Sequence, residues 1–378
     1  MLRVLQFEPD LRENGAIKVM LDRADRWRQA GVDVRVILAK RLSEEIDQVT
    51  PPAGLDVDFA FRPGRTRYRA LGGIARLGRL ARSSDIILAG REIDSGLLLG
   101  HRVASIARRP FTATVHMHFE DALREWVPER QQGRTRRALR SVDHAVLVAD
   151  TLRRDLVRLG IPADRQVVVP NGVDYESLVI AAKEGSPIES DGRPTVVAVG
   201  RLARQKGFDV LLAAHRLALD GGHAHRVLIV GDGPDRHMLE RLAADLGIEA
   251  SVTFLGFQRN PFPILAAADV FVLSSRQEGH PLSLIEALLL GVPAVATDCT
   301  TAVRRMLTHP ARGEVVAVED PDALAAGLVR RLTGAAAYVD GPRAPLIDPS
   351  EVDPEASARA HLGTLLPVVQ RQHRDWGW

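Results

Sequence analysis

Cysteine is nearly absent from this chain of 378 residues, which contains a single cysteine, Cys299. One cysteine cannot form an intrachain disulfide or a cysteine-based metal site, so we expect a reducing, cytoplasmic location. No uninterrupted apolar run reaches the roughly 20 residues that a membrane-spanning helix needs. The opening MLRVLQFEPDLREN has too short an apolar part for a signal peptide, and we expect none.

A strong charge of one sign is also missing. Lysine and arginine number 50 and aspartate and glutamate 48, which gives a net charge of +2. Nothing in this balance favours nucleic acid as a partner. Aromatic residues are scarce at 4%, whereas hydrophobic residues make up 46% of the chain. The length and this apolar content predict two globular domains of ordinary size, each with its own core.

Strand-like and helix-like segments alternate through the first half of the chain. Short apolar runs bounded by turn residues predict strands at 2–7, 32–38, 85–88, 111–116, 143–148 and 167–169. Segments with helical periodicity fall between them, at 16–30, 74–82, 97–107 and 151–159. This alternation is typical of a doubly wound parallel sheet.

A polar stretch at 174–193 is predicted to be a linker, and a second α/β series follows it. We therefore expect two Rossmann-like doubly wound domains, 1–173 and 174–355, facing each other across a cleft. A structureless loop is expected at 333–354. A last helix at about 356–378 is expected to pack back on the first domain.

The most informative pair of residues is Glu278 and Glu286, in SSRQEGHPLSLIEALLLGVPAVATD. Glu278 lies in a turn after the apolar run 270–273, and Glu286 lies one turn into a helix that begins near Leu282. The start of a helix binds anions because its first N–H groups have no internal partner. Two carboxylates beside such a site predict a phosphate ligand flanked by hydroxyls, as in a nucleotide sugar.

Further motifs follow one another through the second half. In order, they are Val199-Gly200-Arg201-Leu202, Gln205-Lys206-Gly207, Val230-Gly231-Asp232-Gly233-Pro234, Phe254-Leu255-Gly256, Glu278-Gly279-His280-Pro281 and Glu286. This series resembles the nucleotide-sugar domain of the retaining glycosyltransferases of family 4, which have the GT-B fold. The resemblance extends over roughly the whole chain and is strong from Asn171 to Asp298.

The resemblance implies roles for the four charged residues of these motifs. Arg201 and Lys206 would stabilise the negative charge that grows on the departing diphosphate. Glu286 would accept hydrogen bonds from the ribose hydroxyls, and Glu278 would contact the donor sugar. Glu286 also has an alternative role, because its spacing from Ser283 fits a capping box.

The remaining donor-site residues are backbone contacts or lining groups by the same resemblance. They are Gly15, Gly200, Gly231, Gly256, Phe257, Gly279, His280, Pro281, Leu282 and Ser283. His280 stands where the family more often has phenylalanine, which leaves the donor sugar open. Gly15 follows Asn14, where the family often has a glycine pair. No metal-binding motif accompanies these residues, so we expect neither a metal nor another cofactor beside the donor substrate.

In the first domain, His116 ends a predicted strand and resembles a histidine that lies close to the reacting sugar in the family. His118 is its competitor two residues further on. Acidic residues follow three predicted strands at their carboxyl ends, where such sheets bind ligands. These candidate acceptor-binding residues are Glu8, Asp10, Glu92, Asp94, Glu120 and Asp121. Converging carboxylates would attract a cationic acceptor, such as an amino sugar or aminocyclitol of aminoglycoside antibiotic biosynthesis.

We thus expect a retaining glycosyltransferase that moves a hexosyl or amino-hexosyl unit, with UDP favoured as the carrier, to a hydroxyl of a small polar acceptor. One alternative is a cell-wall or lipid-linked acceptor, for which the basic stretches 62–82 and 130–140 would form a peripheral membrane face. Another is a nucleotide-sugar epimerase of the same fold. A binding protein without catalysis is a third, against which the complete charged set argues. The oligomeric state stays open.

Overall fold

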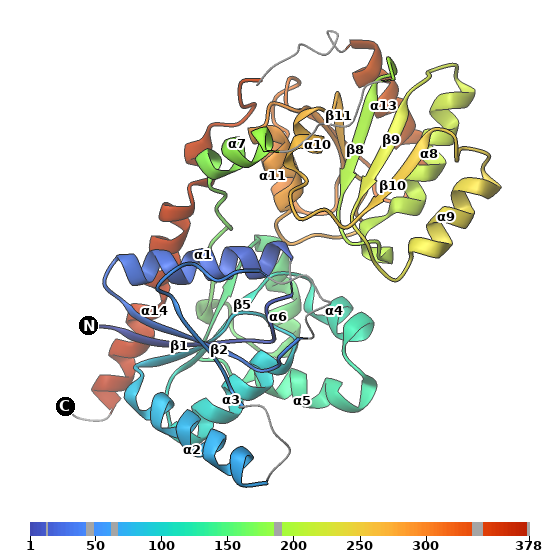
Figure 1. Cartoon of the computed structure of the whole chain (residues 1–378). Coiled ribbons are helices and arrows are strands. Elements are labelled where there is room, and N and C mark those ends of the chain that lie inside the picture. Colours follow the sequence, from blue (N-terminus) through green and yellow to red (C-terminus); the bar gives the residue numbers. More distant parts are fainter. Residues whose placement is uncertain (13, 43–48, 62–66, 185–190, 335–342, 376–378) are drawn as a thin grey trace. The chain divides into compact units, whose positions relative to one another are not determined.

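The computed structural model describes residues 1–375 apart from 13, 43–48, 62–66, 185–190 and 335–342. These residues form two compact units (Figure 1). Unit 1 comprises Met1–Gly172 together with Pro354–Trp378, and unit 2 comprises Val173–Asp353. The chain therefore passes from unit 1 into unit 2 and back again.

Unit 1 contains a sheet whose seven described strands follow the order β3-β2-β1-β4-β5-β6-β7, with every pair parallel. The strands are β1 (Arg3–Glu8), β2 (Asp33–Leu38), β3 (Asp56–Phe59), β4 (Ile86–Ala89), β5 (Phe111–Val115), β6 (His144–Leu147) and β7 (Gln166–Val168). Strands β4, β5 and β6 are buried along their whole length. Such burial is expected where helices cover both faces of a parallel sheet.

Helices lie between these strands in the sequence. They are α1 (Gly15–Gln29), α2 (Arg67–Ser83), α3 (Ser95–Ala107), α4 (Phe119–Trp126), α5 (Glu129–Arg140) and α6 (Arg153–Leu159), with short 3-10 turns at Asp150–Leu152 and Ala163–Arg165. The longest described helix, α14 (Pro354–Asp375), comes from the far end of the chain.

Helix α14 packs against α1 in unit 1 (Figure 1). The indole N–H of Trp27 donates to the Ala358 carbonyl at 2.7 Å, and Nη1 of Arg23 lies 2.7 Å from Nδ1 of His361. Apolar side chains of α14, among them Leu365, are buried in the same cluster as α1, β1 and β2. Residues more than 300 positions apart therefore share one core.

Unit 2 contains a second parallel sheet, whose six described strands follow the order β10-β9-β8-β11-β12-β13. The strands are β8 (Thr195–Val199), β9 (Arg226–Val230), β10 (Val252–Gly256), β11 (Val270–Leu273), β12 (Ala294–Thr297) and β13 (Gly313–Val316). Renumbered within the unit, this order is the Rossmann order 3-2-1-4-5-6. Both units are thus Rossmann-like, as the alternation predicted.

The helices of unit 2 follow the same alternation. They are α7 (Tyr175–Lys183), α8 (Phe208–Asp220), α9 (Arg236–Asp245), α10 (Phe262–Ala266), α11 (Leu282–Leu289), α12 (Thr301–Met306) and α13 (Pro321–Gly334), with 3-10 turns at Arg204–Lys206 and Pro349–Val352.

Helix α7 falls in the stretch 174–193 that we expected to be a linker, and this part of the prediction was wrong. Asp174 caps the helix by accepting the backbone N–H of Ser177 at 3.0 Å. Leu178 is buried, whereas most other side chains of α7 stay partly or fully exposed. A helix that buries so little leaves a weak apolar period in the sequence.

The strand order reverses at one point in each sheet, between β1 and β4 in unit 1 and between β8 and β11 in unit 2. Doubly wound sheets bind ligands beyond the carboxyl ends of their strands at this point. The loops that follow Glu8 and Ala89 in unit 1, and Val199 and Leu273 in unit 2, hold part of the candidate site residues, among them Glu92, Lys206 and Glu278.

Candidate functional site

The loops that follow β8 and β11 lie against each other in unit 2. Gly207, which precedes α8, has a φ of 62°, and a Cβ atom on it would lie 2.1 Å from the Ser274 carbonyl oxygen. Only glycine combines this backbone conformation with so close an approach. The Ser274 hydroxyl donates to the Lys206 carbonyl at 2.9 Å, which ties the loops together a second time.

This contact brings two of the predicted site residues together as an ion pair. Nζ of Lys206 lies 2.6 Å from Oε1 of Glu278. The Glu278 side chain is 9% exposed and that of Lys206 is 23% exposed. The same Oε1 atom accepts a hydrogen bond from the Ser275 hydroxyl at 2.7 Å. A partly buried carboxylate is therefore held by two donors at the edge of the sheet.

Helix α11 begins beside this pair. Its N-cap is Pro281, no side chain caps the helix, and no acidic residue stands in its first turn. Ser283 lies inside the helix, so the capping box between Ser283 and Glu286 that the spacing allowed is not formed. The positive end of α11 thus remains available to an anion, and Glu286 follows on the next turn.

Other predicted donor residues lie on neighbouring strand ends of unit 2. Gly200 and Arg201 follow β8, and Arg201 is exposed. Gly231 follows β9 with a φ of 136°, and a Cβ atom there would lie 1.9 Å from the Gly200 carbonyl oxygen. The N–H of Gly231 donates to the Gly256 carbonyl at 2.8 Å, and Phe257 beyond it is 40% exposed. These loops therefore share one edge of the sheet.

His280 and Gly279 lie between Glu278 and α11. Burial lowers the pKa of His280 to about 4, so its ring is neutral at pH 7. Its Nδ1 atom is buried and has no hydrogen-bond partner among the residues that the structure describes. The Gly279 carbonyl accepts from the Thr300 hydroxyl at 3.1 Å. The turn that carries the candidate sugar contacts is thus fixed from the start of α12.

Arg276, which sequence reasoning missed, anchors the same loop. Its guanidinium bonds the carboxylates of Asp209, at 2.7 and 2.8 Å, and of Glu319, and its side chain is 16% exposed. These carboxylates hold the pKa of Arg276 above its usual value. The position directly after two serines at a strand end was the only signal for it, because its partners are distant in sequence.

In unit 1, Glu8 ends β1 and is fully buried. Burial raises the pKa of Glu8 to about 8, and the negative charge of Asp94 acts in the same direction. Its Oε1 atom accepts from the Gln6 amide at 2.7 Å. A Cβ atom on Gly90 would lie 1.8 Å from that oxygen. Glu8 is therefore a neutral group inside the sheet edge at pH 7 rather than an exposed anion.

Glu92 and Asp94 also serve the fold. Oε1 of Glu92 accepts the Met117 N–H at 2.9 Å, and burial raises the pKa of Glu92 to about 7. Asp94 caps α3 by accepting the N–H groups of Gly96 and Leu97 at 2.7 and 3.1 Å, and burial raises its pKa to about 6. Both carboxyls are thus committed to backbone N–H groups.

The two candidate histidines of unit 1 have separate partners. Nε2 of His116 lies 3.0 Å from the Gly90 carbonyl oxygen, next to the reversal point. Nδ1 of His118 lies 3.1 Å from Oδ2 of Asp155, and this hydrogen bond lowers the pKa of Asp155. Both histidines thus lie beyond the carboxyl end of β5, and His116 contacts the loop after β4.

Two further acids are paired with arginines: Glu120 with Arg136 at 2.7 Å and Asp121 with Arg124 at 2.5 Å. The remaining predicted residues of unit 1 lie near the start of α1. Oδ1 of Asp10 accepts the Arg12 N–H at 3.0 Å, and Gly15 is the first residue of α1. Most of the carboxylates that we expected to converge as free charges therefore have partners within the chain.

The basic stretch 62–82 lies partly outside the described residues, and the stretch 130–140 belongs to α5. Thr135, Ala138 and Leu139 form the buried face of α5, while most of its arginines are exposed. Within the described ranges, no helix is both long and apolar enough to cross a membrane. Nor do three histidine, cysteine or acidic side chains of those ranges gather as metal ligands would.

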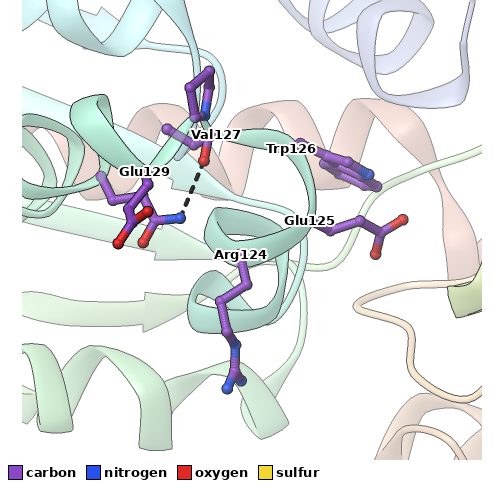
Figure 2. A pocket seen from close by; sticks show the side chains of 7 residues that line it. Arg124, Glu125, Trp126, Val127 and Glu129 are labelled. Carbon is purple, nitrogen blue, oxygen red and sulfur yellow. Dashed lines mark hydrogen bonds between the residues drawn. The ribbon is translucent and has the colours of Figure 1, made fainter.

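A hollow of ≈ 580 Å³ lies at the corner between α4 and α5 (Figure 2). Its lining side chains point in different directions, with Arg124, Glu125 and Glu129 diverging from one another. The Gln132 amide donates to the Val127 carbonyl at 3.1 Å and so closes the corner. Polar groups that do not converge make this hollow a weaker candidate than the edge of the unit 2 sheet.

Two protein-family models match the chain, one in each unit. Residues 14–177 match the model described as "Glycosyltransferase Family 4". Residues 193–333 match the model described as "Glycosyl transferases group 1". The second match contains all the motifs around Lys206, Glu278 and Glu286.

Individual relatives agree with these models. The lipopolysaccharide core biosynthesis glycosyltransferase LpsE of Rhizobium meliloti is 38% identical over 116 residues, which cover 31% of this chain and 32% of that protein. Alpha-monoglucosyldiacylglycerol synthase of Streptococcus pneumoniae is 27% identical over 256 residues, 63% of this chain and 57% of that protein. The chain spans about a third of the length of the first curated relatives it matches.

Solved structures share the fold over almost the whole chain. The Anabaena protein HepE, crystallised with UDP and glucose, has a TM-score of 0.69 at 19% identity, with 100% of this chain and 99% of that chain covered. Two Rossmann-like units are the building blocks of such proteins. Together, the two family models and this architecture support a family 4 glycosyltransferase with the GT-B fold.

Proposed function

We propose that the protein is a retaining glycosyltransferase that transfers a hexosyl unit from a UDP-sugar to a hydroxyl group. This proposal rests on the ion pair between Lys206 and Glu278, whose Nζ and Oε1 atoms lie 2.6 Å apart. The pair lies at the point where the strand order of the unit 2 sheet reverses, beside the uncapped start of α11. A cation, a carboxylate and a free helix end meet there, and a sugar diphosphate needs all three.

The diphosphate binds at the start of α11 and is stabilised by Arg201 and Lys206. An ammonium group has three N–H donors, and Glu278 uses one of them. Lys206 therefore keeps its partner while it donates to a phosphate oxygen. As the bond to the anomeric carbon breaks, negative charge grows on the diphosphate, and these cations stabilise it.

The two glutamates orient the rest of the donor. Glu286 follows the α11 start on the next turn of the helix and accepts hydrogen bonds from the ribose hydroxyls. Glu278 faces the hexose, with one oxygen occupied by Lys206 and Ser275 and the other left for a sugar hydroxyl. HepE, solved with UDP and glucose, shares the fold and supports UDP as the carrier.

Retention follows if the acceptor hydroxyl attacks on the face that the diphosphate leaves. The departing phosphate oxygen then accepts the proton of that hydroxyl, so no separate protein base is required. We keep His116, at the carboxyl end of β5, as the candidate catalytic residue of unit 1. No step in this scheme uses a metal.

We favour a saccharide acceptor over a cationic one. Glu8, Glu92 and Asp94 have raised pKa values, and Glu120 and Asp121 are paired with arginines, so the acids of unit 1 present less free negative charge than their number suggests. LpsE is named for lipopolysaccharide core biosynthesis, which supports a glycan acceptor. The second candidate is an aminocyclitol or aminoglycoside acceptor, which would bind to Asp10 and neighbouring residues of these loops.

A donor and acceptor screen tests the proposal. Purified protein is incubated with UDP-sugars and with neutral or amino-bearing saccharides, UDP release is measured, and the anomeric configuration of the product is read by NMR. We expect UDP release, an α-linked product from an α-linked donor, and a turnover at least about 100-fold lower for Lys206→Ala. Arg204→Ala, an exposed cation two positions away, is the matched control. Inversion at a sugar ring carbon without an acceptor would identify an epimerase instead.

A further inference from the structure

Buried hydroxyl groups line the ends of β11 and β12 below the Lys206–Glu278 pair. Four of them are almost inaccessible to solvent: Ser274, Ser275, Thr297 and Thr300. Three donate to backbone carbonyl groups of this region, as Ser274 does to Lys206 and Thr300 to Gly279. Ser275 differs, because its hydroxyl donates to the Glu278 carboxylate at 2.7 Å.

Ser275 is itself held in place from the neighbouring strand. The Thr297 hydroxyl, at the end of β12, is placed to donate to the carbonyl oxygens of Ser275 and, at 3.2 Å, of Leu273. Thr297 is completely buried and Ser275 is 1% exposed. A chain of hydrogen bonds therefore runs from the sheet core through Ser275 to one carboxylate oxygen of Glu278.

That oxygen receives both of the hydrogen bonds described for the carboxylate, from Nζ of Lys206 at 2.6 Å and from the Ser275 hydroxyl at 2.7 Å. One donor alone would leave the carboxylate free to turn about its last side-chain bond. Two donors from different elements, the loop after β8 and the loop after β11, fix the plane of the carboxylate. The direction of the second oxygen, Oε2, is then fixed as well.

We propose that Ser275 is a positioning residue that orients Glu278 so that Oε2 meets the donor sugar. The role rests on the proposed function, because it needs a nucleotide sugar at this site. Ser275 reaches the donor through Glu278, because the hydrogen bond described for its hydroxyl goes to that carboxylate at 2.7 Å. Removing the hydroxyl should therefore weaken the contact with the hexose and leave the affinity for UDP unchanged.

The test compares Ser275→Ala with wild-type protein, using UDP and the UDP-sugar that wild-type protein turns over fastest. Calorimetry gives the affinity for each ligand, and steady-state kinetics gives kcat and KM. We expect Ser275→Ala to keep the UDP affinity of the wild type within about twofold. Its kcat should fall about 10- to 100-fold, the range of one hydrogen bond to a charged group.

A matched control separates positioning from loss of a buried hydroxyl as such. Ser251→Ala removes another buried serine hydroxyl of unit 2, which bonds His215 at 2.8 Å and lies outside the site. This variant should lose stability but keep both kcat and the preference for UDP-sugar over UDP. A Ser251→Ala enzyme with the same kinetic defect as Ser275→Ala would overturn the positioning role.

A binding cycle with Glu278→Ala gives a readout that needs no turnover. The ratio of UDP-sugar affinity to UDP affinity should fall on Ser275→Ala in the wild-type background and stay unchanged in the Glu278→Ala background. Equal falls in both backgrounds would show that Ser275 acts independently of Glu278 and would overturn the inference. A wild-type protein without UDP-sugar binding or turnover would overturn the proposed function, and this role with it. Normal wild-type turnover with an unimpaired Ser275→Ala enzyme would overturn this role alone.

Discussion

Acidification from pH 7 to pH 5 should destabilise unit 2 through a buried pair of histidines. His215 and His225 are both completely buried, and Nδ1 of His215 lies 2.8 Å from Nε2 of His225. Nδ1 of His225 faces the His223 carbonyl oxygen at 2.8 Å and so carries its proton. Nε2 of His225 therefore accepts the Nδ1–H of His215. Nε2 of His215 in turn lies 2.8 Å from the Ser251 hydroxyl.

The magnitude follows from the pKa of His215, which burial lowers from 6.5 to about 3. Between pH 6.5 and pH 3 the unfolded chain binds a proton that the folded chain does not bind, so stability falls as the pH falls. The slope is about 1.4 kcal/mol per pH unit, which gives a loss of about 2 kcal/mol between pH 6.5 and pH 5. Burial also lowers the pKa of His225, which adds to the loss in the same direction.

The assay compares wild-type protein with His215→Leu, which cannot titrate at this position. Urea unfolding is followed at pH 5, 6, 7 and 8 by circular dichroism and by hydrogen exchange of peptides from β9. Tryptophan fluorescence is unsuitable, because all four tryptophans lie outside the range of unit 2. The variant should be less stable at pH 7, because the partners of His215 lose their hydrogen bonds. The difference from wild type should shrink by about 2 kcal/mol at pH 5.

Parallel loss of stability in the two proteins between pH 7 and pH 5 would refute this reasoning. Titrating groups that do not contact His215 are common to both proteins and cancel in the difference; His225 is the exception, because it shares a hydrogen bond with His215. A difference that grows on acidification would mean that the folded state binds the proton more tightly than the unfolded state. In that case His215 would be charged in the native protein.

Three further predictions concern single residues. Burial raises the pKa of Glu8 to about 8, so the contribution of Glu8 to stability is full below pH 4.5 and is lost as the pH rises to 8. Over this range the free energy of unfolding falls by about 1.4 kcal/mol per pH unit. Glu8→Gln should remove this pH dependence in urea titrations of unit 1. Gly207→Ala should cost about 1–3 kcal/mol more of the free energy of unfolding than Gly222→Ala. A Cβ atom at position 207 would meet Ser274, whereas Gly222, with a φ of 83°, has open space around it. Equal losses of stability in melting experiments would contradict this steric argument. Glu286→Gln should weaken UDP binding about tenfold in calorimetry, beyond any effect on the melting temperature, whereas a purely structural role would lower the melting temperature and spare UDP.

The sequence predicted the two parallel sheets well, because buried strands and amphipathic helices leave distinct periodicities. It also placed Lys206, Glu278 and α11 correctly on loops after β8, after β11 and at the following helix. It did not predict that Lys206 and Glu278 form an ion pair. They are 72 positions apart, and only the strand order puts their loops side by side.

Expectation and structure differ where local sequence and tertiary contacts disagree. The capping box was the alternative to the ribose role of Glu286, and it does not form because α11 begins at Leu282 and places Ser283 inside the helix. The acids of unit 1 were expected to converge as free charges. Composition cannot reveal that Asp94 caps α3 or that Arg136 bonds Glu120. Whether such a carboxylate is neutralised depends on the position of each side chain in the folded structure.

The return of α14 to unit 1 has a consequence for biosynthesis. Unit 2 is complete once residue 353 has been made, whereas Trp27 and Arg23 wait for Ala358 and His361. During translation the unit that begins first is therefore finished last, against the usual order in which the N-terminal domain folds first. Until α14 has been made, the apolar side chains of α1 and β2 lack the cover that Leu365 and its neighbours give them in the finished unit. Nascent chains that stop after residue 353 should therefore bind chaperones more than chains that include α14.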